Sequence, residues 1–80
     1  MLVNIGGGCF INKRDIEVVV PPESAPIKRL VSANIDAGKC VDLTYGKRTR
    51  SVIIMKTGRI YLAPIQPASV VAKITKDLSE

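Results

Sequence analysis

The chain has 80 residues, 46% of them hydrophobic, and a formal net charge of +5, which suits a single basic domain with a thin core of its own. It contains no histidine, so the commonest general base and the Ser–His and Cys–His nucleophile pairs are missing, and we expect neither enzymatic activity nor a cofactor. Cys9 and Cys40 stand far apart without a ligand-like spacing, which favours two buried thiols in a reducing cytoplasm over a metal site. No stretch has the pattern of a leader peptide or the length of a membrane span, so we expect a soluble cytoplasmic protein without a membrane partner.

The first twenty residues predict three short strands, over residues 1–5, 9–11 and 16–20. Gly6–Gly8 separates the first two strands and favours a tight turn or a bulge. A phosphate loop is disfavoured there, because the lysine-containing pattern and a following helix are both absent. Residues 12–15 predict a polar turn, and Pro21 and Pro22 end the third strand because proline cannot donate to the ladder.

A helix is predicted over residues 25–37, because its start and stop signals agree. Ser24 is a suitable N-cap, Pro26 falls in the first turn, and Gly38 suits the position just past the end. Its apolar residues recur at helical spacing and fall on one face, made of Ile27, Leu30, Val31 and Ile35.

The second half predicts a short strand over residues 41–43, a strand over 51–55 covered on both faces, and a hairpin turn at 56–59 into a strand over 60–63. A final helix begins near Pro67, with an apolar stripe made of Val70, Val71, Ile74 and Leu78. The chain is therefore expected to form one α+β domain over residues 1–80, with a small, mostly antiparallel sheet and two helices.

The positive charge is concentrated in the second half of the chain. Residues 1–42 carry five basic and five acidic side chains, whereas residues 43–76 carry seven basic side chains and no acidic one. Such a one-sided excess attracts polyanions, which makes it evidence about partners rather than about the fold.

The strongest candidate site is the segment 44–50 between two predicted strands, where Lys47, Arg48 and Arg50 follow a Tyr-Gly pair. Arginine offers a planar fork that matches phosphate and guanine edges, while lysine acts as a point charge. Neighbouring hydroxyls suit phosphate oxygens and come from Thr44, Thr49 and Ser51. The alternative is a solvated loop, or one that pairs with carboxylates of a neighbouring subunit.

Arg14, in the early polar turn, is a second candidate for contacting nucleic acid. The alternative is an ion pair with Asp15 or Glu17, and spacing alone leaves both open. Tyr45 is suited to stacking on a base, but a tyrosine beside a glycine turn more often packs on its own strand.

Three stretches of the chain resemble the RemA family of bacterial regulators of biofilm matrix genes. They are Pro22–Arg29, Tyr45–Met55 and Gln66-Pro67, and the similarity extends over nearly the whole chain. The resemblance implies a small, ring-forming DNA-binding protein that activates transcription of extracellular matrix and osmoprotection genes. It also implies that the DNA contacts fall on Lys47, Arg48 and Arg14.

The chain departs from the family pattern at three positions. Lys47 stands where the family often has arginine, which preserves a phosphate contact but loses a bidentate base contact. Gly7 replaces an aromatic residue and Cys9 a polar one near the N-terminus.

The resulting hypothesis is a nucleoid-associated transcription regulator that binds or wraps double-stranded DNA as a homo-oligomeric ring, through Arg14, Lys47, Arg48 and Arg50. The abundance of aliphatic residues on so small a domain independently favours burial between subunits. The competing hypotheses are an RNA-binding module, and an adaptor whose basic loop meets an acidic protein or a small anionic ligand. No small-molecule substrate is expected.

Overall fold

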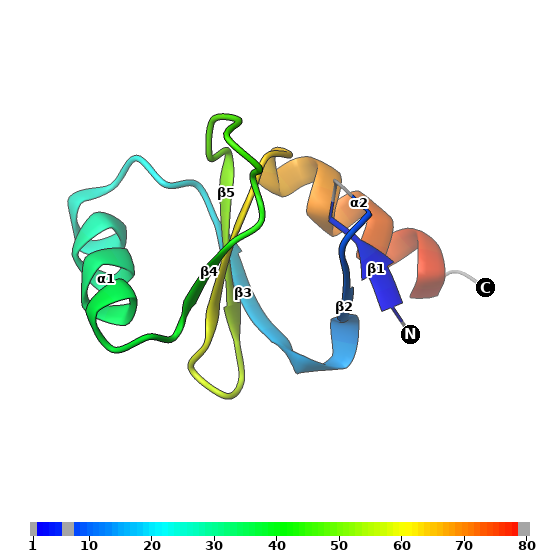
Figure 1. The fold of residues 1–80 in the computed structure, drawn as a ribbon. Helices are drawn as coiled ribbons and strands as arrows, with labels where there is room; N and C mark the ends of the chain where they lie inside the picture. Colours follow the sequence, from blue (N-terminus) through cyan, green and yellow to red (C-terminus); the bar gives the residue numbers. More distant parts are fainter. Residues whose placement is uncertain (1, 6–7, 79–80) are drawn as a thin grey trace.

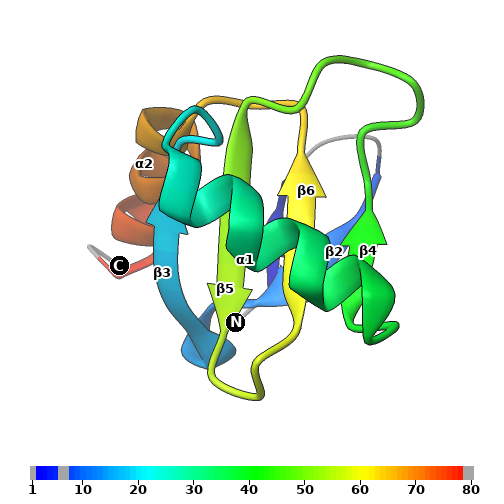
Figure 2. The same ribbon diagram turned by 90° about the vertical axis from the view of Figure 1, so that its left-hand side faces the viewer.

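The computed structural model describes residues 2–5 and 8–78, with side chains as far as Thr75, and its centre is a four-stranded sheet. The strands lie in the order β3 (Ile16–Val20), β5 (Ser51–Met55), β6 (Ile60–Ala63) and β4 (Cys40–Asp42). β5 pairs antiparallel with β3 and β6, whereas β4 runs parallel to β6 at the edge (Figure 2).

The other elements cover the two faces of this sheet. One face carries helix α1 (Ala25–Asp36), and the other carries helix α2 (Pro67–Leu78) together with a two-stranded hairpin, β1 (Leu2–Asn4) and β2 (Phe10–Asn12) (Figure 1). The described part of the chain thus forms three layers, and the α+β class predicted from sequence is confirmed.

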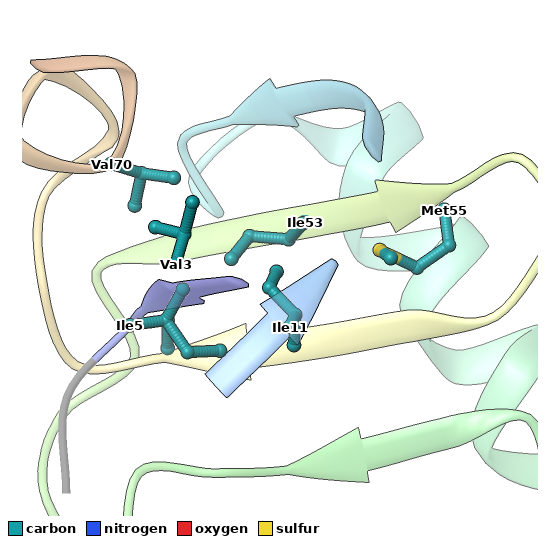
Figure 3. Packing of buried hydrophobic residues seen from close by; sticks show 7 residues of the cluster. Val3, Ile5, Ile11, Ile53, Met55 and Val70 are labelled. Atoms are coloured by element: carbon teal, nitrogen blue, oxygen red, sulfur yellow. The ribbon is translucent and has the colours of Figure 1, made fainter. Parts of the chain in front are cut away.

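The main core lies between the sheet and the hairpin (Figure 3). Because neighbouring residues of a strand point to opposite faces, Ile53 and Met55 of β5 face the hairpin while Val52 faces α1. Val52 and Ile53 are both 0% exposed, so this strand is covered on both faces, as its apolar run predicts. The remaining buried members of the core are Val3, Ile5, Ile11, Ala63 and Val70.

Helix α1 has well-formed ends but a loosely packed body. The Ser24 hydroxyl accepts a hydrogen bond from the Ile27 N–H at 3.3 Å. At the other end, Gly38 adopts a φ of +73°, and the N–H groups of Gly38 and Lys39 donate to the carbonyls of Ile35 and Asn34, at 3.0 and 2.8 Å. These two bonds form a Schellman motif, which stops the helix.

The apolar face predicted for α1 is only partly packed. No residue of the helix is buried, and Leu30 and Ile35 are 39% and 56% exposed. A hollow of about 360 Å³ lies between the helix and the sheet, with Val31 and Leu62 in its lining. The sheet therefore covers the apolar face of this helix only in part.

The strand pairings are mostly antiparallel, as predicted, but the arrangement of the strands differs from a single sheet of hairpins. The strands form two sheets rather than one, and β4 pairs parallel with β6 because the connection from β4 crosses the end of the sheet before β5 begins (Figure 2). The polar turn is a 3₁₀ helix at Lys13–Asp15. The turn or bulge predicted at Gly6–Gly8 lies largely outside the described residues, although the Ile5 N–H donates to the Cys9 carbonyl at 3.0 Å.

The second helix follows its prediction more closely. α2 begins at Pro67, and Val70 is 0% exposed against the core, whereas Val71 is 49% exposed. Ile74 is half-buried beside the same core. The side chain of Leu78, the last residue of the predicted apolar stripe, lies beyond Thr75 and outside the described side chains. Within the part of the chain that the structure describes, neither helix is long and apolar enough to span a membrane.

Candidate nucleic-acid interface

The basic loop, residues 43–50, joins β4 to β5 at one end of the sheet (Figure 1, top). It contains a tight turn in which the Lys47 N–H donates to the Thr44 carbonyl at 3.0 Å. Tyr45 and Gly46 at its centre have φ values of +54° and +84°. Two successive positive φ values are typical of a type I′ turn, a conformation that glycine adopts readily and tyrosine does not.

Both ends of the basic loop are fixed to β6 by the backbone. The Leu43 N–H donates to the Leu62 carbonyl and the Arg50 N–H to the Ala63 carbonyl, each at 2.9 Å. These bonds continue the sheet on either side of the loop, so the segment between them projects from a rigid base.

Thr44 and Asp42 brace the start of the turn. One carboxylate oxygen of Asp42 accepts from the Thr44 hydroxyl at 2.5 Å and from the Thr44 N–H at 2.9 Å. The bond from the hydroxyl, and to a lesser extent the bond from the backbone N–H, hold the pKa of Asp42 below its ordinary value. The carboxylate is therefore committed to the turn rather than to a neighbouring cation.

The Tyr45 hydroxyl and the Cys9 thiol form a hydrogen bond of 2.8 Å between the basic loop and the hairpin. This bond raises the pKa of Tyr45 above its ordinary value, so the phenol stays neutral. The tyrosine is 66% exposed, which makes the expectation that it packs on its own strand wrong.

The two thiols are less buried than predicted. Cys9 and Cys40 are both free and half-buried. Burial, followed by the nearby charge of Asp42, raises the pKa of Cys40. Among the described residues, no three potential metal-ligating side chains of the His, Cys, Asp and Glu types come together.

The structure brings together Lys47, Arg48 and Arg50, all of them exposed on the basic loop. None of these side chains forms an ion pair or a hydrogen bond with another described residue. Three unpaired cations on an anchored loop form a positive surface that suits an anionic partner.

The hydroxyls beside these cations do not all reach that surface. Thr44 and Ser51 are 3% and 0% exposed, so the expectation that they donate to phosphate oxygens is wrong. Thr49 is half-buried and lines the surface hollow that Arg48 and Arg50 also line. Burial of Thr44 and Ser51 depends on packing across the sheet, which the local sequence does not reveal.

Arg14 lies at the opposite end of the sheet, in the 3₁₀ helix (Figure 2). The length of β5 separates the two ends by about 16 Å at roughly 3.3 Å per residue. Arg14 makes no ion pair with Asp15 or Glu17, both of which the structure describes. One protomer therefore does not bring Arg14 to the basic loop.

Sequence reasoning missed the basic residues that lie near Arg14. The Lys56 N–H donates to the Asp15 carbonyl at 2.7 Å, which joins the 3₁₀ helix to the turn between β5 and β6. Exposed Lys56 and Arg59 flank that turn. The sequence does show two cations around Gly58, which could have suggested a second basic patch. Their position near Arg14 follows only from the pairing of β3 with β5.

Comparison with known proteins identifies the family of the chain. Residues 2–74 match the RemA-like family, described as extracellular matrix regulatory protein A-like. A relative from Natranaerobius thermophilus is 44% identical over 79 residues, covering 99% of this chain and 89% of the relative. Relatives from Moorella thermoacetica (45% over 74 residues, 92% of this chain and 81% of the relative) and Carboxydothermus hydrogenoformans (44% over 79 residues, 98% and 91%) are also similar. All three are named "Putative regulatory protein". With a family match over nearly its whole length, the chain belongs to the RemA-like family.

Proposed function

We propose that this chain is a DNA-binding regulator of transcription that contacts duplex DNA through the basic loop. The observation that carries the proposal is the set of exposed and unpaired cations on that loop, Lys47, Arg48 and Arg50. Most protein–DNA hydrogen bonds go to phosphates, and they come from side chains of these types. The names of the relatives support a regulatory role, and the family description supports extracellular matrix genes as the targets.

The proposal includes a homo-oligomeric ring, because one basic loop supplies few phosphate contacts. Repeating the loop around a closed oligomer makes later contacts intramolecular, which raises avidity by roughly 10²–10⁴. Exposed apolar side chains are available for subunit contacts on the outer face of the hairpin, where Leu2 and Phe10 are 61% and 58% exposed. Contacts made from loops suit wrapping or bending of DNA rather than insertion of a helix into a groove.

The test is duplex binding by fluorescence anisotropy for Arg48→Ala and Lys47→Ala, at several salt concentrations. Each variant is expected to weaken binding at least tenfold and to flatten the salt dependence, whose slope is about −0.9 per neutralised phosphate. Arg14→Ala is expected to act in the same direction but less severely. Arg29→Ala, which removes an exposed cation from α1, is the matched control and should stay close to wild type.

Parallel titrations separate the competing functions. Tighter binding of single-stranded RNA than of duplex DNA at the same salt would favour the RNA-binding module. Binding of neither nucleic acid would favour the adaptor and overturn the proposal. An Arg48→Ala variant that loses its oligomeric mass while keeping DNA contacts would make the basic loop an assembly element instead.

A further inference from the structure

A hollow of about 300 Å³ lies between the basic loop and the start of α2. The loop contributes residues 48–50, the α2 side contributes 66–68, and the connection from β3 to α1 contributes 21 and 23. Three segments far apart in the sequence therefore line one surface depression.

The lining is rich in groups that donate hydrogen bonds and carry positive charge. Arg48 and Arg50 both face the hollow, and neither is paired with a described residue. Guanidinium groups have only donors and match the oxygens of phosphate in pairs. Two such groups at one depression therefore suit a phosphate group.

The start of α2 adds donors to the same depression. Pro67 has no N–H, and the N–H of Ala68, at the second position of the helix, has no acceptor within the helix. Gln66, which also lines the hollow, carries a side-chain amide. The partial positive charge of the helix end has the same sign as the two arginines.

Lys47 belongs to a different surface. It lines a separate hollow with Thr44, Tyr45 and Pro64. The cations of the basic loop therefore divide into an arginine pair that faces α2 and a lysine that does not.

Among the described residues that line the hollow, Glu23 alone is acidic. No ion pair within 4 Å links it to Arg48 or Arg50. The Glu23 carboxylate repels an incoming anion at short range, so it weakens the binding of any anionic ligand that the two arginines attract. This opposition gives the hollow a specific signature, because removing the charge of Glu23 must strengthen anion binding.

We propose that the hollow formed by Arg48, Arg50 and the start of α2 binds a single phosphate group, opposed by Glu23 and independent of Lys47. The inference rests on the proposed function where the phosphate belongs to DNA. A free phosphate has the same chemistry, and the two sources are distinguished by experiment.

The experiment uses the full chain with two probes: a duplex of about twenty base pairs, followed by anisotropy, and inorganic phosphate, followed by amide chemical shifts. Arg50→Ala is expected to weaken duplex binding at least tenfold. Glu23→Gln is expected to tighten it three- to tenfold. Asp36→Asn, which makes the same charge change on α1, should stay within about twofold of wild type. Inorganic phosphate should shift the amides of Gln66 and Ala68 in wild type and in Lys47→Ala, but not in Arg50→Ala.

The outcomes separate the inference from the proposed function. If duplex binding depends on Arg48 while Arg50→Ala and Glu23→Gln match their control, the inference is overturned and the DNA-binding function stands. If phosphate shifts the α2 amides but no duplex binds, the hollow is a site for free phosphate and the DNA-binding function fails. If neither probe binds, both fail. Equal responses to Glu23→Gln and Asp36→Asn would reduce the effect to overall charge and overturn the site.

Discussion

Replacement of Tyr45 tests whether the basic loop is held in its turn by one residue in a left-handed conformation. A non-glycine residue at φ near +54° costs about 1–2 kcal/mol relative to a right-handed conformation. The hydrogen bond between the Tyr45 hydroxyl and the Cys9 thiol offsets only a small part of this cost, because it lies at an exposed site.

These magnitudes predict an order of stability among four proteins. Tyr45→Asn relieves most of the strain, since asparagine tolerates this region, and should match or exceed wild type. Tyr45→Phe keeps the backbone strain and loses the hydrogen bond to Cys9, so its unfolding free energy should be slightly lower than that of wild type. Tyr45→Val adds the penalty of a β-branched residue and should lose about 1.5–2 kcal/mol.

Urea denaturation at one fixed protein concentration measures this order. With a slope near 1 kcal/mol per molar urea for a domain of this size, the valine variant should unfold at about 1.5–2 M less urea than wild type. Tyr61→Phe is the control, because it removes a tyrosine hydroxyl from a half-buried residue of β6 whose backbone is not left-handed. A Tyr45→Val protein as stable as wild type would refute the argument that this turn constrains the loop.

Three other outcomes are expected. Light scattering should give a mass several times that of the 8.6 kDa chain, and a monomer at micromolar concentration would contradict the ring and its avidity. The pKa of Asp42 is lowered by folding, so its stabilising effect is complete above about pH 4, the unfolded value, and is lost as the pH falls through the folded pKa. Urea denaturation should therefore show Asp42→Asn less stable than wild type at pH 7 and level with it near pH 2. Ser51→Ala removes a buried hydroxyl that has no hydrogen-bond partner among the described residues and should stabilise the fold by about 1 kcal/mol in the same assay; a loss of stability would mean that the hydroxyl is bonded after all.

The sequence predicted those elements whose ends and burial are encoded locally. The apolar run of residues 51–55 defines β5 to the residue, and Ser24 and Gly38 define α1 because capping depends on single side chains and a single φ value. The parallel pairing of β4 with β6 was missed, because nothing local distinguishes it from a hairpin. The exposure of Leu30 and Ile35 was missed for a related reason, since periodicity marks an apolar face but not whether a partner covers it.

The same division holds for the candidate site. Charge counting along the chain was enough to single out Lys47, Arg48 and Arg50. Only the topology separates them from Arg14 and gives Arg14 its basic neighbours at the far end of the sheet. The position of Glu23 beside the arginines is likewise a product of tertiary structure, because more than twenty residues of chain lie between them.

The loose packing of α1 has a consequence for the motions of the native state. A helix of 12 residues is only marginally stable by itself in water, so α1 depends on its contacts with the rest of the protein. These contacts are few, because every residue of α1 is at least partly exposed. The free energy needed to detach it is then a fraction of that needed to unfold the core between sheet and hairpin. Backbone amides of α1 should exchange with deuterium well before those of β5, and trypsin should reach Lys28 and Arg29 while the sheet is still folded. Each such opening would expose Val52 and Ile60, which are fully buried when the helix is in place. The helix therefore shields a hydrophobic face of the sheet that would otherwise favour aggregation.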